Sequence, residues 1–325
     1  MTPSDTVLSQ PQSLAQGNYQ SSLRGGDLVS LNDLSPDAFF EILDIAADIK
    51  QRVKQGEQVH ALADKSLAML FEKPSLRTRS TFDVGMFQLG GHAVLLDQQF
   101  VGIGKRESLR DVASNLERWF DGIMARTFAH STVEMLAQHA SVPVINGLTD
   151  LVHPCQLLAD YLTLRETFSE LNGLHVVFVG DGNNVVHSHI YAALLAGTTL
   201  TVACPEGYEP HANIVAAARD KGATINISHD PREAVQGADV LYTDVWTSMG
   251  QEEETAARLK AFAGYTVTTD WLADLAPTGV FMHDLPAHYG EECTEDVLYN
   301  PRSVVFDQAE NRLHAQKGLL VALLG

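Results

Sequence analysis

Two arginines and two hydroxyl residues are crowded into residues 71–79, which read F-E-K-P-S-L-R-T-R. The apolar segment 66–70 before them predicts a buried strand, and residues 81–89 after them predict a helix. The free N–H groups and positive dipole end of a helix N-terminus suit an anion, and guanidinium groups add paired bonds to phosphate oxygens. Because the whole chain has a net charge of −19, this basic cluster stands out. The run predicts a phosphate site, with a solvated basic loop as the alternative.

Polar residues near the ends of two further predicted strands could complete such a site. Arg126 ends a buried strand, where it needs an anion or a carboxylate partner, so a ligand role and a structural salt bridge are equally open. His153 is held extended by Pro154 at a helix start, and its imidazole could polarise a carbonyl or move a proton near neutral pH. Gln156 follows with an amide for a neutral polar group.

The segment 180–185, G-D-G-N-N-V, matches the dinucleotide pattern G-x-G-x-x-G only in part. Val185 replaces the third glycine, and no acidic residue closes the following strand, so the pattern is weak evidence for a nicotinamide cofactor. Asn184 instead offers neutral donors and acceptors to a polar small molecule.

Two later loops offer groups that suit an amino acid. Asp244 could hold an ammonium group, and the turn 248–250 could reach a carboxylate, although Ser248 could also be a simple helix cap. The loop 284–286 ends in Leu-Pro, and its carbonyls cannot all be paired internally, so they are available to an NH₂ group. Arg312, near the start of the last predicted helix, could add one more cation.

The composition limits the possible classes of protein. With 325 residues the chain can form two domains, and no apolar run reaches the roughly 18–20 residues of a membrane span. The acidic balance argues against nucleic acid or an anionic membrane as partner. Three cysteines without metal-site spacing indicate free thiols in a reducing cytoplasm. Residues 1–26 are rich in Ser and Gln and predict a disordered tail.

Strands and helices alternate along the rest of the chain in two series. The first has strands at 66–71, 93–96, 122–125 and 142–145, with helices at 35–53, 81–89, 108–120 and 132–139. The second has helices at 156–166, 185–196, 212–221 and 309–324, with strands at 175–180, 199–204, 224–227, 240–243 and 280–283. Such alternation predicts an α/β fold of two doubly wound parallel-sheet domains, with ligands at the carboxyl ends of the strands in the cleft between them. We place the domains at 27–153, joined by the C-terminal helix 306–325, and at 154–305.

Taken together, the motifs resemble the aspartate/ornithine transcarbamylase family, on the ornithine side, from about residue 26 to the end. The family's S-T-R-T-R is similar to S-L-R-T-R at 75–79, and its H-P-x-Q to 153–156. Its D-x-x-x-S-M-G, which separates ornithine from aspartate enzymes, is matched at 244–250, and its E-N-R at 310–312. The resemblance implies transfer of a carbamoyl group from carbamoyl phosphate to the δ-amine of L-ornithine, giving L-citrulline and phosphate.

The resemblance also implies roles for individual residues. Ser75, Leu76, Arg77, Thr78 and Arg312 would bind the phosphate. Arg126 and His153 would hold the carbamoyl oxygen, and Gln156 and the backbone carbonyls of Asp284 and Leu285 would orient the carbamoyl NH₂ group. Ornithine would be bound by Asn184, Asp244, Ser248 and Met249. Arg126, His153 and Asp284 would be the catalytic residues. It implies no metal or organic cofactor, and a cytoplasmic homotrimer, or a multiple of trimers, in arginine metabolism.

One position departs from the family, which has H-C-L-P where this chain has His283-Asp284-Leu285-Pro286. A carboxylate about 4 Å from a phosphate charge would be repelled by roughly 4 kcal/mol at an effective dielectric of about 20. We therefore expect reduced activity and a higher kcat/KM in Asp284→Cys. The alternatives are that Asp284 pairs with the δ-ammonium group or accepts its proton.

Other functions remain open from the sequence. A related enzyme could carbamoylate another amine, such as putrescine or an N-acylated ornithine, although the intact 244–250 motif favours a free α-amino acid. A non-catalytic paralogue could bind carbamoyl phosphate or ornithine and regulate a partner, and Asp284 is the one feature that favours it.

Overall fold

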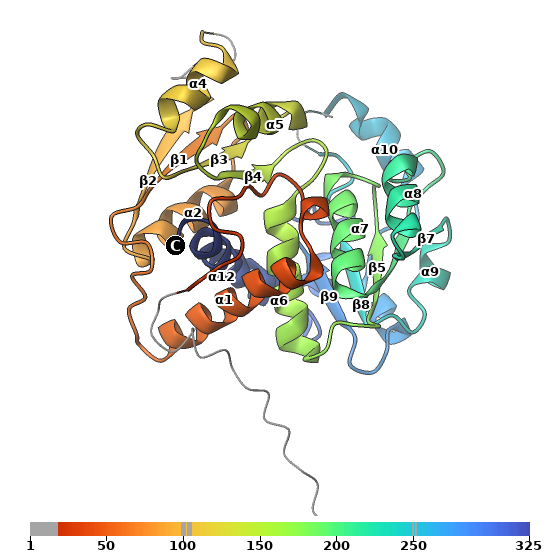
Figure 1. Ribbon diagram of the computed structural model, residues 1–325. Helices are drawn as coiled ribbons and strands as arrows, with labels where there is room; N and C mark the ends of the chain where they lie inside the picture. The colour runs from red at the N-terminus through yellow and green to blue at the C-terminus, as the bar shows by residue number, and fades with distance from the viewer. Residues whose placement is uncertain (1–18, 99–101, 103–105, 249, 251) are drawn as a thin grey trace, which may run out of the picture.

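The computed structural model describes residues 19–98, 102, 106–248, 250 and 252–325. These residues form two parallel β-sheets, one in each half of the chain, with helices packed on both sides (Figure 1). The strand orders are β2-β1-β3-β4 and β7-β6-β5-β8-β9, so each sheet is wound in both directions from an inner strand. The predicted fold of two doubly wound parallel-sheet domains is confirmed.

The strands of the first sheet are β1 (Ser66–Phe71), β2 (His92–Asp97), β3 (Gly122–Arg126) and β4 (Val144–Leu148). The second sheet contains β5 (His175–Val179), β6 (Thr199–Ala203), β7 (Thr224–Ser228), β8 (Val240–Thr243) and β9 (Val280–His283). The longer helices are α1 (Pro36–Lys54), α2 (Leu76–Gln88), α4 (Leu109–Leu116), α5 (His130–His139), α6 (Pro154–Phe168), α7 (Asn184–Ala196), α8 (Ala212–Asp220) and α12 (Val305–Leu324). Short helices are α9 (Pro231–Ala234), α10 (Thr255–Ala261) and α11 (Glu295–Leu298).

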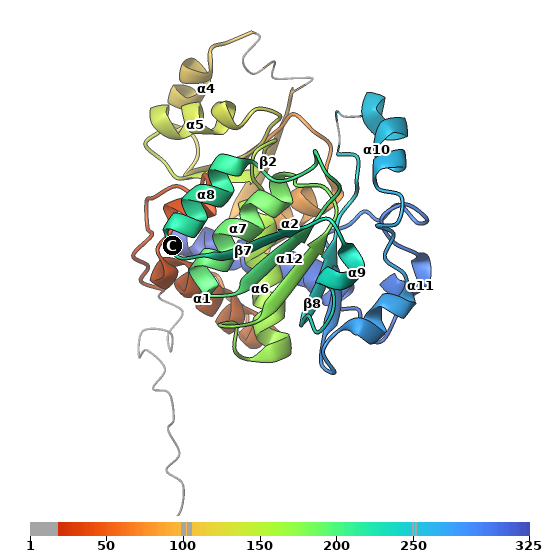
Figure 2. The ribbon, with the colours of Figure 1, turned by 90° about the vertical axis from the view of Figure 1, so that its right-hand side faces the viewer.

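Strand β1 shows why the strands appear in the sequence as continuous apolar runs. Leu67 and Met69 lie in the core with α1, α2 and α12, whereas Ala68 and Leu70 pack on the other face with α4 and α5. A parallel strand with helices on both faces must be apolar at every position. Strand β5 follows the same rule, and Figure 2 shows α10 and α11 on the side of the second sheet away from α7.

The last helix joins the two halves. Helix α12 packs against α1 and α2 of the first half and against α6, which leads into the second. Its buried face therefore holds Arg312 at the junction, 2% exposed. The helix begins at Val305, one turn before the predicted start, so the E-N-R element lies in its second turn rather than at its beginning.

Two other predicted boundaries are wrong in ways that matter for the site. Helix α2 starts at Leu76 instead of residue 81, because the Ser75 side chain caps it by accepting a hydrogen bond from the Thr78 backbone N–H. Strand β4 starts at Val144 rather than residue 142, since Pro143 has no N–H to give to the sheet.

The disordered tail predicted for residues 1–26 extends too far along the chain, because residues 19–26 are ordered. Tyr19 is buried, and its hydroxyl donates to Asp48 Oδ2 at 2.6 Å, so residues 19–26 are anchored to α1. Residues 1–18 lie outside the described part of the chain. Among the helices of the described residues, none combines the length and the apolar character that crossing a membrane requires.

Candidate active site

A cavity of about 430 Å³ lies where the carboxyl ends of strands from both sheets meet. Segments following β1, β4, β8 and β9 line it, together with Arg126 at the end of β3, the start of α7 and one side chain of α12. The structure brings every described residue of the predicted site to this cavity: Ser75, Leu76, Arg77, Thr78, Arg126, His153, Gln156, Asn184, Asp244, Ser248, Asp284, Leu285 and Arg312. Met249, predicted to bind ornithine, lies outside the described residues.

One end of the cavity is a helix N-terminus surrounded by arginines. Leu76, Arg77 and Thr78 form the first turn of α2, so the S-L-R-T-R run is the helix start itself rather than a loop before it. The Thr78 hydroxyl accepts hydrogen bonds from Arg126 Nη1 at 3.2 Å and from Arg312 Nη2 at 3.1 Å. Two guanidinium groups from distant parts of the sequence are therefore fixed on one hydroxyl.

The arginines lack a counter-charge of matching size. Burial, followed by Arg312 and Arg77, lowers the pKa of Arg126 to about 9. Burial also lowers the pKa of Arg312, and the Nε atoms of Arg126 and Arg312 have no hydrogen-bond partner among the described residues. A bound anion would relieve both the charge repulsion and the missing hydrogen bonds, so this end of the cavity is an anion site in physical terms.

His153 lies beside the arginines as a neutral imidazole. Its backbone N–H donates to Ser188 Oγ at 2.7 Å, which fixes the start of α6. Burial first, and then Arg312, Arg126 and Arg77, hold the pKa of the His153 side chain well below 6.5. Its Nδ1 atom has no partner within the described structure, so the ring is available to hydrogen-bond a ligand without carrying charge.

Two carboxyl groups, those of Asp244 and Asp284, also line the cavity. Asp244 is 6% exposed, and its Oδ2 atom accepts from Asn183 Nδ2 at 2.8 Å. Asn183 was not among the predicted site residues. Its side chain caps α7, and an asparagine directly before a predicted helix is a signal that the sequence does contain. Asn184 lines the cavity, but its Nδ2 atom donates to the Thr149 carbonyl at 2.6 Å.

Asp284 is deeply buried beside Asp244. Burial first, and then the Asp244 carboxyl, raise the pKa of Asp284 well above its ordinary value, and Arg77 opposes them. The surroundings of Asp284 therefore favour its protonated form, against the expectation of a charged carboxylate at this position. Its Oδ1 atom has no hydrogen-bond partner in the described part of the molecule.

The loop after β9 presents backbone to the cavity. Leu285 has a φ of 60°, a left-handed conformation that is uncommon for leucine, and its N–H donates to His283 Nδ1 at 2.8 Å. Arg77 Nη2 donates to the Leu285 carbonyl. The left-handed conformation thus turns the Leu285 carbonyl toward Arg77, which pairs it within the protein, whereas the sequence predicted carbonyls available to an NH₂ group.

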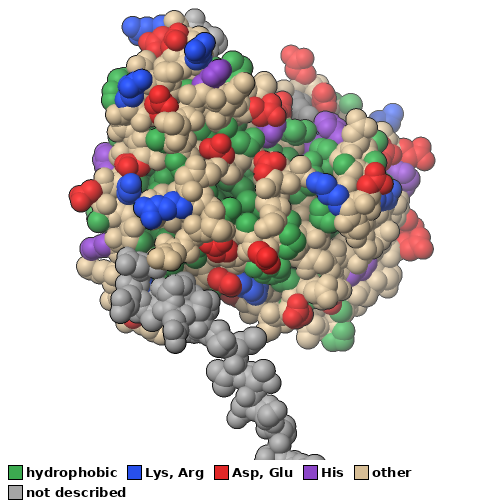
Figure 3. Space-filling model, in the orientation of Figure 1, with side chains coloured by type: hydrophobic (Ala, Val, Ile, Leu, Met, Phe, Trp, Pro, Cys, Tyr) green, Lys and Arg blue, Asp and Glu red, His purple; other side chains and the backbone are tan. Residues whose placement is uncertain are grey.

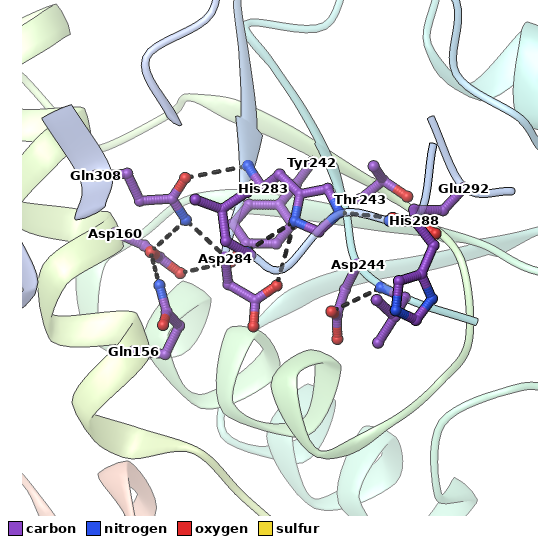
Figure 4. A network of polar contacts seen from close by, with 12 residues as sticks. Gln156, Asp160, Tyr242, Thr243, Asp244, His283, Asp284, His288, Glu292 and Gln308 are labelled. Atoms are coloured by element: carbon purple, nitrogen blue, oxygen red, sulfur yellow. Dashed lines mark hydrogen bonds and ion pairs between the residues drawn. The ribbon is translucent and has the colours of Figure 1, made fainter. Parts of the chain in front are cut away.

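Several lining or supporting residues were not predicted. Lys73 and His288 line the cavity, and the Lys73 Nζ atom lies 4.3 Å from the centre of the Phe128 ring. Lys73 belongs to the same basic run as Arg77 and could have been selected with it. Asp160 and Gln308 lie behind the cavity wall and give no signal in the sequence pattern (Figure 4).

The fold and the cavity together define a two-domain α/β enzyme with a buried anion site. The chain belongs to the aspartate/ornithine carbamoyltransferase family: the carbamoyl-P binding domain model matches residues 26–166, and the Asp/Orn binding domain model matches residues 172–323.

Relatives match over nearly the whole chain. The ornithine carbamoyltransferase of Thermus thermophilus is 55% identical over 298 residues, which are 92% of this chain and 96% of that protein. The one from Deinococcus radiodurans is 52% identical over 304 residues, or 93% and 98% of the two chains. Among solved structures, ornithine carbamoyltransferase from Pyrococcus furiosus matches with a TM-score of 0.90 at 48% identity, covering 94% of this chain and 99% of that one.

Proposed function

We propose that this protein transfers the carbamoyl group of carbamoyl phosphate to the δ-amine of L-ornithine, giving L-citrulline and phosphate. The observation that carries the proposal is the pair of buried guanidinium groups on Thr78 Oγ1, beside the first turn of α2, in a cavity that two carboxyls also line. One substrate is an acyl phosphate, which is an anion, and the other is a diamino acid with two ammonium groups, so the cavity needs groups of both charges. The names of the similar proteins support these two substrates.

In this proposal the phosphate sits at the N-terminus of α2. Ser75, Leu76, Arg77 and Thr78 donate backbone and side-chain hydrogen bonds to it, and Arg312 completes the set. The helix dipole and the guanidinium charges then stabilise the phosphate as it becomes the leaving group.

Arg126 and His153 hold the carbamoyl oxygen. As the amine attacks, the carbonyl oxygen gains negative charge, and preorganised donors at that position lower the barrier. A neutral His153 donates a hydrogen bond without adding a fourth positive charge to a site that already holds three arginines. Gln156 and the backbone carbonyls of Asp284 and Leu285 accept hydrogen bonds from the carbamoyl NH₂ group.

Asn184, Asp244 and Ser248 hold the α-groups of ornithine, and Met249 remains part of the proposal. The δ-ammonium group first loses a proton, and its nitrogen lone pair then forms the new C–N bond. The C–O bond to phosphate breaks, and the second amine proton leaves as citrulline forms. No metal or organic cofactor is needed, because the mixed anhydride is already activated toward an amine.

We propose a homotrimer, or a multiple of trimers, in the cytoplasm. Helix α2 carries Leu76 and Phe87, which are 78% and 77% exposed, and Val84, which is 41% exposed. Large apolar side chains on one exposed helix support a contact between subunits. The helix starts at the cavity, so this contact would adjoin the active site.

Citrulline formation from carbamoyl phosphate tests the proposal, with L-ornithine, putrescine, N-acetylornithine and aspartate compared as acceptors. Turnover with ornithine alone supports the proposed reaction. Turnover with another acceptor supports a related carbamoyltransferase instead. Calorimetric binding of carbamoyl phosphate without turnover of any acceptor supports the non-catalytic paralogue.

A further inference from the structure

Asp160 lies behind the cavity, one turn of α6 beyond Gln156, and is fully buried. Its Oδ1 atom accepts hydrogen bonds from Gln156 Nε2 at 2.8 Å and from Gln308 Nε2 at 2.7 Å. Its Oδ2 atom accepts from the Tyr242 hydroxyl at 3.1 Å. Figure 4 shows these side chains converging on Asp160 from α6, β8 and α12.

The neighbours of Gln156 allow only one orientation of its amide. Gln156 Oε1 accepts from Arg312 Nη1 at 2.5 Å, and arginine can only donate, so this end must be the oxygen. The amide nitrogen must then face an acceptor, which is Asp160 Oδ1. Asp160 and Arg312 therefore aim the acceptor oxygen of Gln156 at the arginine side of the cavity.

The same argument fixes Gln308. Its Oε1 atom accepts from the backbone N–H of His283 at 3.0 Å, and a backbone N–H can only donate. The nitrogen end consequently faces Asp160 Oδ1. His283 directly precedes Asp284 and Leu285, so this bond sets the start of the loop whose carbonyls face the cavity.

We propose that Asp160 is a positioning residue that holds in place the groups accepting hydrogen bonds from the carbamoyl NH₂ group. The site thereby selects carbamoyl phosphate over acyl phosphates that carry a methyl group in place of the NH₂ group. The Oδ1 atom of Asp160 fixes the orientation of the Gln156 amide and, through Gln308, the position of the carbonyls of the 284–285 loop. The inference rests on the proposed function, because it concerns the NH₂ group of that substrate. A site built to accept hydrogen bonds from NH₂ rejects a methyl group, which leaves the acceptors unpaired.

The positioning of these acceptors does not depend on whether Asp160 is charged. Among the described residues, the charged and titratable groups that face it are Arg312, Asp284, the hydroxyls of Tyr242 and Tyr161, and His189, whose Nε2 atom lies 4.0 Å from Oδ2. Burial raises the pKa of Asp160 to about 7, but Oδ1 must accept from two amides in either state. A proton can only sit on Oδ2, facing Tyr242. An asparagine with its oxygen in the Oδ1 position would keep both amides in place.

The test measures Kd by calorimetry for carbamoyl phosphate, acetyl phosphate and inorganic phosphate on the full chain. In Asp160→Ala, the ratio of the acetyl phosphate Kd to the carbamoyl phosphate Kd should fall at least about tenfold, equivalent to losing about one hydrogen bond. The Kd for inorganic phosphate should stay within about threefold. Asp160→Asn should retain the ratio. Tyr242→Phe is the matched control and should also retain it: this change removes the hydrogen bond to Oδ2 and the one from Gln308 Nε2 to the hydroxyl, but leaves both bonds to Oδ1 in place.

An unchanged ratio in Asp160→Ala, or equal weakening of all three ligands, would overturn the inference in favour of a purely structural role. If Asp160→Ala does not fold, Gln308→Met decides, because it breaks the link to His283 and should lower the same ratio. Citrulline formation by the wild type is measured beside these titrations. Its absence would contradict the proposed function, whereas wild-type turnover with an unchanged ratio in the variants would contradict only the role of Asp160.

Discussion

Thr78 shows how much a single hydroxyl does in this site. It accepts from Arg126 and Arg312, so it holds two like charges close together while a phosphate group is absent. Arginine can only donate, so the Thr78 oxygen is the acceptor that the two guanidinium groups share. The position is a threonine for its oxygen rather than for its methyl group.

Thr78→Val should raise the KM for carbamoyl phosphate by about ten- to a hundredfold, because charge-assisted hydrogen bonds contribute ~1.5–3 kcal/mol. Steady-state kinetics measure the change. Thr81→Val is the matched control, since the Thr81 hydroxyl donates to the Arg77 carbonyl within the same helix and does not face the cavity. Equal KM values in the two variants would contradict the role of Thr78.

Asp284 gives a prediction that depends on pH. Its raised pKa means that it is neutral at low pH, where it resembles the neutral thiol of the family, and becomes charged as the pH rises. The gain in kcat/KM in Asp284→Cys should therefore be smaller at low pH and grow as the pH rises. A pH–rate profile of both proteins tests this, and a gain that is constant or that shrinks with pH would contradict it.

Asp284 should also affect stability with a defined sign. Between its unfolded pKa of about 3.9 and its raised folded pKa, the folded state binds more protons than the unfolded state, so stability falls as pH rises. Asp284→Asn should remove this loss. Its free energy of unfolding should exceed that of the wild type at pH 7 by more than at pH 4, as measured by urea unfolding, and a gap that widens toward pH 4 would refute the assignment.

At the scale of elements, the loop between β5 and α7 explains the incomplete glycine pattern. A Cβ atom at Gly182 would lie 2.2 Å from the Pro210 backbone nitrogen, so the glycine is needed for packing against the 208–210 segment. Asp181 beside it pairs with Arg258 at 2.9 Å. The glycine that makes this loop resemble a nucleotide-binding turn is thus explained by the close packing of the loop against the 208–210 segment.

Gly182→Ala should destabilise the protein by roughly 2 kcal/mol or more, because the obstructing atoms are backbone and cannot rotate away. It should also raise the KM for ornithine, since Asn183 and Asp244 are linked across this loop. Thermal unfolding and kinetics measure the two effects, and a variant of wild-type stability would contradict the packing argument.

The sequence predicted elements well where the apolar pattern was continuous. Strands β1, β8 and β9 have the predicted bounds, because their buried runs end at polar loops. The start of α2 was missed because Arg77 and Thr78 look like loop residues until the Ser75 cap is seen. Asp160 and Gln308 could not be found, since their roles depend on contacts between residues 148 positions apart.

At the scale of the whole molecule, the acidic surface and the basic interior of the cavity serve different purposes. Figure 3 shows acidic side chains spread over both halves of the face in view rather than gathered in one patch. Arg77, Arg126 and Arg312 line the cavity, and the low exposure of Arg126 and Arg312 strengthens their interaction with an anion. A net charge of −19 also favours solubility.

The proposed trimer gives a prediction at this scale. Phe87→Glu places a charge on the exposed apolar face of α2 and should dissociate the assembly, because a buried unpaired charge is costly. Light scattering coupled to size-exclusion chromatography measures the mass. Leu259→Glu on α10, where leucine is 41% exposed, is the control that should leave the mass unchanged. A wild-type mass equal to one chain would contradict the trimer outright.

The most direct test of the central claim follows the carbamoyl carbon itself. Carbamoyl phosphate labelled with ¹³C is incubated with L-ornithine and the protein, and the products are identified by mass spectrometry and NMR. The account predicts citrulline with the label in its ureido carbon for the wild type, and a large loss of this product in Arg126→Met. Label found only in the hydrolysis products of carbamoyl phosphate, with ornithine unchanged, would contradict the account.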